Sequence, residues 1–386
     1  MIICGGGWMP HNLSEGWRRI GFSVEEFFYG THMGKSWSNA GREENKCINE
    51  QLLLVAKRLK AEGHLTLIFS VIYDDVLSIE TARKLRALGV PMVNYHVDLI
   101  GQWYRVLRTG KYFDYLACAQ EDHWQGLRRA GIRPLLLPMA ANPPTPNSVS
   151  GPDRTYNGVL YLGSPWLYRR AVLAELAREG LPLRIYGRNW HRRTPDPANA
   201  QPWRKALHDM RHYLLPRLRD DNGSELGATV RNRLRRVTPS AEGAVNLPPE
   251  CVHGSYASTE FVPLVRGAAM NLGFTHFLGE PGTAAERRQV RLRDFEIPMA
   301  GGFYLAQDCN QLRKLFQVGK HVETWDKLPE LKEKVRYYIE HPGEGRRIAS
   351  AGQSHCLRYH TWASRFAELL GALKLPLPEE RSAAPV

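Results

Sequence analysis

The sequence contains no apolar run long enough to cross a lipid bilayer. Its longest apolar stretch, around residues 64–73, is well short of the ~20 residues that a membrane-spanning helix needs. The first residues, MIICGGGWMP, have neither the basic lead nor the apolar core of a secretory signal. We therefore expect a cytoplasmic protein with no membrane span.

Metal-binding and nucleic-acid-binding motifs are also missing. The six cysteines include no CxxC pair, so the sequence indicates neither a disulfide framework nor a zinc site, and we expect reduced thiols. It has no zinc-finger spacing, RNP aromatics or basic heptad region. No D-x-D motif stands between a strand and a turn, and the nearest acidic pair, Asp74–Asp75, is interpreted as solvated loop charges. We expect neither a metal site nor a cofactor.

Positive charge is the most uneven feature of the composition. The chain has 52 Lys and Arg residues against 39 Asp and Glu, a net charge of +13. Such a charge raises the local concentration of anionic ligands, such as nucleoside diphosphates, nucleic acid or acidic glycans. It does not choose among them.

The hydrophobic pattern predicts two α/β units. In this chain of 386 residues, short β-branched apolar runs alternate with longer amphipathic stretches, which is typical of parallel sheets covered by helices. Residues 140–157, rich in Pro, Ser and Asn, cannot continue a helix or a central strand. We therefore predict Rossmann-like domains at 1–145 and 155–365, then a helix end and flexible tail at 366–386.

The same pattern predicts the elements of each domain. In the first domain we expect strands at 1–4, 23–28, 65–73, 91–97, 115–119 and 134–137, and helices at 43–61, 79–88 and 122–130. In the second we expect strands at 158–162, 183–186, 268–273, 302–306 and 321–325, and helices at 167–179, 328–340, 342–359 and 362–373. Residues 190–249 are too many for an α/β loop, so we predict a helical insertion there. Its arginine-rich face is either solvated or a platform for an anionic acceptor or a partner.

The segment RLRDFEIPMAGG at 291–302 is the most informative motif. A helix that carries Arg293 and Glu296 places a cation and a carboxylate one turn apart on a single face. A carboxylate can accept both hydrogen bonds of a ribose diol, and a guanidinium can donate two to phosphate oxygens. The pair therefore suits a ribosyl diphosphate, although the spacing alone also fits an ordinary surface ion pair.

Several segments of the second domain form an ordered series. They are VLYLGSPWLYRR at 159–170, LRIYGRNW at 183–190, VHGSYASTE at 252–260, AAMNLGF at 268–274, RDFEIPMAGGFYLA at 293–306 and HPGEGRRIASAGQSHCLRYHTWASR at 341–365. In this order they resemble the C-terminal half of the GT-B glycosyltransferases, in the group-1-like branch that includes CgeB-like proteins. The resemblance implies two Rossmann-like domains that face a cleft, with the insertion in the second. Residues 1–110 match only in rhythm.

For the nucleoside end of a donor, the resemblance implies binding residues at three places. Glu296 takes the position of the family's ribose-binding glutamate, and Arg293 precedes it as in the R-x-F-E form of the motif. Gly187 and the His253–Gly254 pair match turns that pack around the nucleobase. Gly187 and His253 fit purely structural roles equally well.

For the diphosphate, the resemblance implies contacts from glycine turns and a second cation. Gly301 and Gly302 would let backbone amides approach it, since no Cβ stands in the way. Gly163 and Ser164 lie at a strand-to-helix turn that would face the cleft. Arg169 or Arg170 on the next helix would supply the cation, although both also suit solvated helix positions.

One departure from the family leaves the stereochemistry open. Retaining members carry an E-x7-E pair, and here the position of the first glutamate is Arg288, with Glu280 and Glu286 out of register. An inverting transfer would need a base that removes the acceptor proton.

Asp98 is the leading candidate for that base, because it follows a predicted strand in NYHVDLIGQW. His96, two residues earlier, is a second catalytic candidate. Asp98 also suits a capping role. His11 and His32, in polar loops, are weaker candidates. The glycines of GGGW at 5–8 do not form the G-x-G-x-x-G of dinucleotide enzymes. The resemblance implies a loop here that faces the cleft and helps to seat the acceptor or the donor, and a structural turn fits these residues equally well.

The sequence therefore predicts a metal-independent glycosyltransferase that uses a nucleoside-diphosphate sugar. Its acceptor is unidentified and would be a small molecule, a glycan, a protein or a modified nucleic acid. The alternatives are a sugar-nucleotide epimerase and a non-catalytic GT-B-like protein that binds nucleic acid or a partner through the basic insertion.

Overall fold

The computed structural model describes residues 1–30, 39–145, 155–190, 247–284 and 286–378, and these form two compact units. One unit comprises the described residues of Met1–Met139 and those from Trp362 onward, and the other comprises the described residues from Ala140 to Thr361. The predicted insertion at 190–249 falls almost wholly outside the described residues. Among the described helices, none combines the length and the apolar character needed to span a bilayer.

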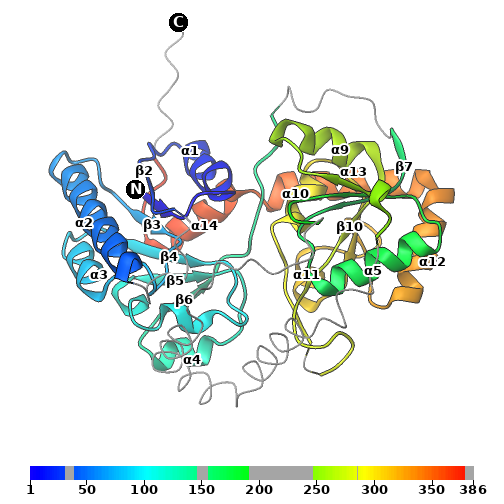
Figure 1. Cartoon of the computed structure of the whole chain (residues 1–386). Helices are drawn as coiled ribbons and strands as arrows, with labels where there is room; N and C mark the ends of the chain where they lie inside the picture. Colours follow the sequence, from blue (N-terminus) through cyan, green and yellow to red (C-terminus); the bar gives the residue numbers. More distant parts are fainter. Residues whose placement is uncertain (31–38, 146–154, 191–246, 285, 379–386) are drawn as a thin grey trace, which may run out of the picture. The chain divides into compact units, whose positions relative to one another are not determined.

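The first unit is built on six parallel strands in the order β2-β1-β3-β4-β5-β6 (Figure 1). The strands are β1 (Ile2–Cys4), β2 (Glu26–Phe28), β3 (Ile68–Ser70), β4 (Met92–His96), β5 (Tyr115–Cys118) and β6 (Pro134–Leu136). The helices are α1 (Glu15–Arg19), α2 (Asn39–Ala61), α3 (Ile79–Arg86), α4 (Trp124–Arg129) and α14 (Trp362–Leu373), with single turns η1 (Pro10–Ser14), η2 (Trp103–Val106) and η3 (Gly110–Tyr112).

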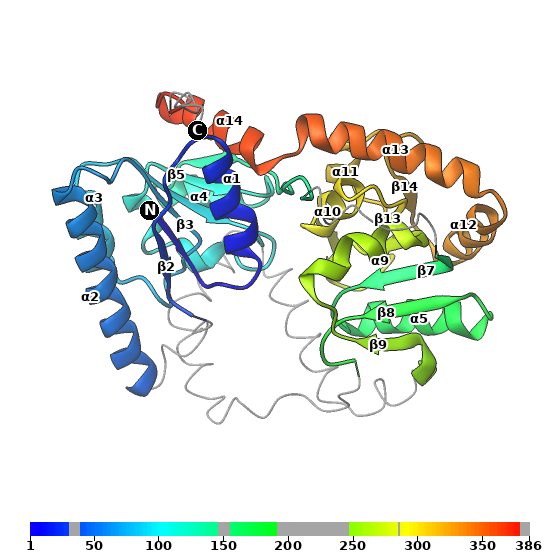
Figure 2. The ribbon, with the colours of Figure 1, turned by 90° about the horizontal axis from the view of Figure 1, so that it is seen from above.

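Helix α14 closes the first unit from the far end of the chain. Trp362 and Phe366 are fully buried, and the ring of Phe366 stacks on Trp17 of α1 with centroids 4.2 Å apart. Figure 2 shows α14, in red, next to α1. The sequence placed the boundary at residue 365, inside this helix, because its apolar face looks like any other until its packing partner is known.

The second unit has a second parallel sheet, in the order β14-β13-β10-β7-β8-β9. The strands are β7 (Tyr156–Leu162), β8 (Leu183–Tyr186), β9 (Val252–Gly254), β10 (Ala268–Gly273), β13 (Tyr304–Gln307) and β14 (Glu323–Trp325), and β11 (His276–Leu278) and β12 (Arg287–Arg288) form an antiparallel hairpin. The helices are α5 (Leu167–Arg178), α9 (Phe261–Gly267), α10 (Arg293–Met299), α11 (Asn310–Leu315), α12 (Leu328–Glu340) and α13 (Pro342–Tyr359), with turns η6 (Pro249–Cys251) and η7 (Ser258–Glu260).

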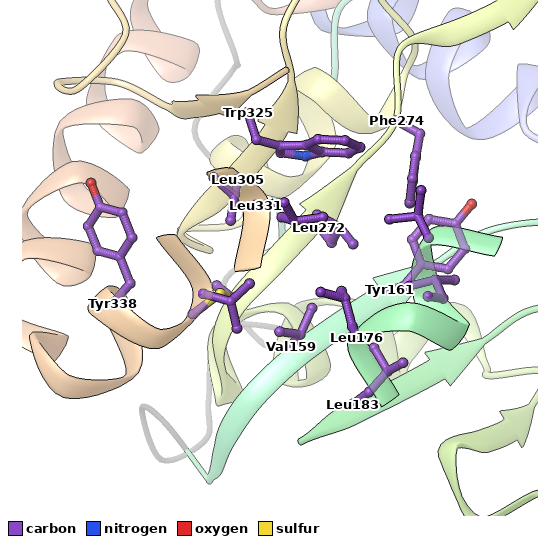
Figure 3. Packing of buried hydrophobic residues seen from close by; sticks show 14 of the residues in the cluster. Val159, Tyr161, Leu176, Leu183, Leu272, Phe274, Leu305, Trp325, Leu331 and Tyr338 are labelled. Atoms are coloured by element: carbon purple, nitrogen blue, oxygen red, sulfur yellow. The ribbon is translucent and has the colours of Figure 1, made fainter. Parts of the chain in front are cut away.

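Helices cover both faces of this sheet, which is why most residues of β7, β10 and β13 are buried. Figure 1 shows α5 and α12 on one side and α9, α10 and α13 on the other. Figure 3 shows the core on the side of α5 and α12, where Val159, Leu272 and Leu305 of the strands meet Leu176 and Leu331 of the helices. The predicted class, α/β with two Rossmann-like units, is confirmed.

The elements that were not predicted are short. Strand β9, helix α9 and the β11–β12 hairpin span too few residues to show a clear period. The helical segment of η1 and α1 begins at Pro10, close after the glycines at 5–7, and no helix was predicted there.

Candidate functional site

The carboxyl edge of the second sheet gathers several of the predicted donor-binding residues. Gly163 and Ser164 follow β7, Gly187 follows β8, and Gly254 ends β9. Strands β7 and β10 are neighbours in the sheet. From β7 the next strand along the chain, β8, is added on one side, and from β10 the next, β13, is added on the opposite side. The carboxyl ends of β7 and β10 therefore form the switch point, where open α/β sheets bind ligands.

The turns at this edge hold one another through backbone contacts. The amide of Gly163 donates to Tyr186 O at 2.9 Å, and that of Gly187 donates to Gly254 O at 2.6 Å. Trp190 Nε1 donates to Gly163 O at 2.8 Å. A Cβ on Gly187 would lie 2.1 Å from Gly163 O, so this position requires glycine. The two amides are therefore engaged in shaping the edge.

Arg293 and Glu296 form an ion pair in the first turns of α10. The guanidinium also donates from Nη2 to Tyr256 Oη at 2.6 Å and lies 4.9 Å from the ring centroid of Phe261. Their side chains remain 36% and 18% exposed, so a ligand can reach both. Burial alone would lower the pKa of Arg293, but Glu296 and Tyr256 raise it. The predicted pair is thus embedded in an aromatic cluster and is not an isolated surface pair.

The aromatic cluster continues to the end of β8. Tyr186 and the exposed His253 stack with centroids 5.0 Å apart and an interplanar angle of 18°. Tyr256 meets Tyr186 edge-on at 6.2 Å. The sequence analysis missed Tyr186 and Tyr256 as site residues, although both lie in quoted motifs, LRIYGRNW and VHGSYASTE. Their aromatic character next to His253 was the available signal.

Arg169 and Arg170 have different environments. Arg169 is buried, and its Nη1 donates to Tyr161 Oη at 3.0 Å and to Ser164 Oγ at 3.4 Å. No described carboxylate forms an ion pair with it. Arg170 instead donates twice to Trp190 O, at 3.2 and 2.8 Å, so it holds the segment after β8 in place. The two predicted cations thus differ, because Arg170 holds a backbone carbonyl and Arg169 donates to hydroxyl groups.

A buried carboxyl that the sequence analysis did not single out fixes the start of α10. Asp294 accepts from the amide of Arg291 at 2.5 Å and from Tyr304 Oη at 2.6 Å. Burial raises the pKa of Asp294 to about 6, although the hydrogen bond from Tyr304 acts to lower it. Burial also raises the pKa of Tyr304, and the positive charges of Arg169 and Arg293 act against these shifts on Asp294 and on Tyr304, respectively.

Gly301 and Gly302 do not lie at this edge, and their predicted contact with the diphosphate is wrong. They end α10 and lead into the amino end of β13, on the opposite edge of the sheet. Their amides donate to Pro298 O and Ile297 O. A Cβ on Gly302 would lie 2.3 Å from Val265 Cγ1, so this glycine serves packing.

Arg288, at the first position of the E-x7-E pattern, belongs to a network of ions. It bonds Glu286 at 2.8 Å and Asp326 at 2.5 Å, and it donates to Asp308 O at 2.9 Å. The carboxylate of Glu286 is therefore engaged in an ion pair with Arg288. It does not take the place of the first glutamate of the E-x7-E pattern.

Three of the four candidate catalytic residues lie in the described part of the first unit, and they differ in access to solvent. Asp98 is half-buried and lies just beyond the carboxyl end of β4. His11 is exposed in η1. His96 is fully buried, and burial lowers its pKa to about 3 despite a 3.2 Å hydrogen bond between Nε2 and Gln102 O. A neutral imidazole without solvent access cannot take a proton from an acceptor, so the prediction for His96 is wrong. His32 lies outside the described residues.

The acidic pair Asp74–Asp75 was also misread as solvated. Asp74 is buried and accepts from the amides of Arg108 and Thr109 at 2.9 and 3.0 Å, and Asp75 pairs with Arg105 at 2.5 Å. Both carboxylates have structural partners. In the described part of the chain, no group of three or more His, Cys, Asp or Glu side chains is arranged to hold a metal ion.

Comparison with solved structures shows the class to which this fold belongs. An Anabaena protein, HepE, solved with UDP and glucose, matches with a TM-score of 0.53 and 11% identity over 97% of this chain and 98% of its own. A trehalose-6-phosphate synthase matches with a TM-score of 0.54, 11% identity and the same coverages. A glycosyltransferase of Rickettsia africae gives 0.51 at 8% identity, over 97% of each chain. The fold is GT-B.

The sequence comparison narrows this class. Residues 229–371 match the family described as glycosyl transferase-like. Among curated proteins, none matches the chain significantly. The matched segment contains α10 with Arg293 and Glu296, and it ends inside α14. The chain therefore has a GT-B fold, and its residues 229–371 match a family described as glycosyl transferase-like, as the sequence motifs predicted.

Proposed function

We propose that the carboxyl edge of the second sheet binds the nucleoside-diphosphate sugar from which this enzyme transfers the sugar. The observation that carries the proposal is the partly exposed Arg293–Glu296 pair, set among Tyr256, Tyr186 and His253. Glu296 would accept the ribose hydroxyls, and the aromatic cluster would flank the nucleobase. UDP is the first probe, because HepE was solved with it.

Arg169 supports departure of the diphosphate without a metal ion or a cofactor. Negative charge grows on the leaving diphosphate as the glycosidic bond breaks, and a fixed cation in a desolvated site stabilises that charge strongly. Arg169 is buried and has hydroxyls, not carboxylates, as its hydrogen-bond acceptors. Its charge is therefore available to an anion.

Asp98 is the proposed general base for an unidentified acceptor, with the exposed His11 as the alternative. Half-burial leaves the carboxylate accessible, and its place at the carboxyl end of β4 is where α/β units present functional groups. We further propose that the chain belongs to the CgeB-like branch, which the ordered motifs of the second domain support, and that it is cytoplasmic. A nucleic-acid acceptor has only the net charge of +13 in its support.

The donor site is tested by thermal shift with UDP, GDP, ADP, CDP and dTDP in the presence of EDTA. One nucleotide should raise the melting temperature, since a ligand at about 100 times its dissociation constant adds about 2.7 kcal/mol. Glu296→Ala should abolish that shift, because the ribose loses its acceptor. Persistence of the wild-type shift in EDTA would agree with a metal-independent site.

The matched control is Glu175→Ala. Glu175 and Arg178 form another i,i+3 pair, near the end of α5 away from the carboxyl edge, so its loss should leave the nucleotide shift intact. An unchanged shift in Glu296→Ala would remove Glu296 from the site. No shift with any of the five nucleotides would reject the donor site itself.

A further inference from the structure

Two aromatic rings lie side by side at the switch point of the second sheet. Trp166 is the N-cap residue of α5, just after β7. Phe277 lies in β11, just after β10, and β10 is the strand that pairs with β7. The centroids of the two rings are 6.5 Å apart, with an interplanar angle of 35°. Trp166 is 41% exposed, the one exposed tryptophan among the described residues. Structural indoles elsewhere in this chain, such as Trp190 and Trp325, are buried.

Guanidinium groups flank both rings. Arg169 lies 5.7 Å from the centroid of Trp166, and Arg291 lies 5.5 Å from that of Phe277. An exposed apolar face beside cations suits a ligand whose apolar face adjoins an anionic group. A sugar ring esterified to a diphosphate has this character, because its axial C–H bonds form an apolar face next to the phosphate.

The order of the contacts along the edge points to the same group. Glu296 and the cluster of Tyr186, His253 and Tyr256 lie on the side of β8 and β9, where we placed the nucleoside. Arg169, placed at the diphosphate, is next to Trp166. In a linear nucleoside-diphosphate sugar, the group that follows the diphosphate is the sugar.

We propose that Trp166, backed by Phe277, is the platform on which the sugar ring of the donor stacks, which makes Trp166 a specificity-determining residue for the sugar. The inference rests on the proposed donor site and adds to it the position of the transferred group. The nucleobase and the acceptor are the competing occupants of this surface.

Titration calorimetry separates these occupants. The best-bound of the five nucleoside diphosphates and its glucose conjugate are titrated into wild type and Trp166→Ala. We expect about tenfold weaker binding of the conjugate and less than about a twofold change for the diphosphate, because the lost ring contacts only the sugar. Trp166→Phe should recover most of the affinity for the conjugate.

Tyr337→Ala is the matched control. Tyr337 is also 41% exposed, but it lies near the end of α12, at the opposite edge of the sheet. It should change neither affinity.

Two results in Trp166→Ala would overturn the proposal. Equal weakening of both ligands would assign the ring to the nucleoside, and no change in either affinity would exclude the ring from donor binding and leave the surface to the acceptor. Retained binding of the diphosphate shows that the variant is folded. If wild type bound none of these nucleotides, the proposed donor site would fail before the platform is reached.

Discussion

Arg169 is buried and forms no ion pair with a described carboxylate. Placing a guanidinium in a buried position is costly, and proteins usually offset the cost with a carboxylate. Here the acceptors are the hydroxyl groups of Tyr161 and Ser164. A charge kept in this state is unfavourable for folding but well prepared for an anionic ligand.

Replacement by methionine should therefore separate stability from binding. Arg169→Met keeps the apolar stem and removes the charge, so we expect a melting temperature equal to or above that of wild type. The affinity for the best-bound nucleoside diphosphate should fall about tenfold or more, since a charge-assisted hydrogen bond contributes roughly 1.5–3 kcal/mol. Calorimetry and thermal melting measure the two effects.

Arg170→Met is the control for this prediction. Its guanidinium holds Trp190 O, so its removal should lower stability, with a smaller effect on affinity. A large loss of stability in Arg169→Met with unchanged affinity would show that Arg169 is structural.

At the residue scale, the sequence predicted contacts between residues that are close along the chain. Arg293 and Glu296 are three positions apart on one helix, so their pairing follows from helical geometry. Tyr256 joins them from a distant segment, and no local rule connects the two. The same limit explains the error at Gly301 and Gly302, because a glycine pair in sequence does not show which edge of the sheet it occupies.

At the scale of an element, β4 illustrates how burial changes a titratable group. All of its residues are buried, and His96 at its end is held neutral, with a pKa lowered to about 3. In the unfolded chain the same imidazole takes up a proton near pH 6.5. Between pH 6.5 and about 3 the unfolded chain therefore binds a proton that the folded protein does not. The free energy of unfolding falls as the pH is lowered through this range.

His96→Gln should remove this part of the acid sensitivity. Wild type should lose about 1.4 kcal/mol of stability per pH unit below 6.5 from this one residue, and the variant should show a correspondingly smaller slope. Urea unfolding of the first unit between pH 7.5 and 4.5 measures it. His64→Gln, at an exposed position, is the control and should keep the wild-type slope. Parallel slopes for His96→Gln and wild type would contradict the burial of His96.

Elements with a clear period were predictable, and short ones were not. Helices α12, α13 and α14 were predicted with the observed bounds, because long amphipathic segments repeat their pattern several times. The β11–β12 hairpin, which carries Phe277, has too few residues for a pattern, and contacts with the rest of the unit define it.

At the scale of the molecule, α14 belongs to the first unit although it is the last described helix of the chain. Trp362 donates from Nε1 to Asn12 Oδ1 at 3.1 Å, and Phe366 packs against Trp17 and Phe69. The first unit is therefore completed by a segment that follows the whole of the second. Its stability depends on residues more than 300 positions away from its first strand.

Phe366→Ala should destabilise the first unit by about 3–5 kcal/mol, the usual cost of removing a buried phenylalanine. Hydrogen exchange should show reduced protection in peptides of β1–β6 and unchanged protection in peptides of β7–β14. Leu357→Ala, at an exposed position of α13, should change neither. Loss of protection in β7–β14 alone would place α14 with the second unit.

The sequence by itself determined the α/β class, the two units, the long elements and the Arg293–Glu296 pair, because periodicity and helical spacing are local properties of the chain. The tertiary structure decided which arginine is buried without an ion pair to a described carboxylate, which histidine is sealed from solvent and which aromatic side chains surround the Arg293–Glu296 pair. These features depend on segments brought together by parallel strand pairing, and that pairing sets burial and charge at the sheet edge where the ligand would bind.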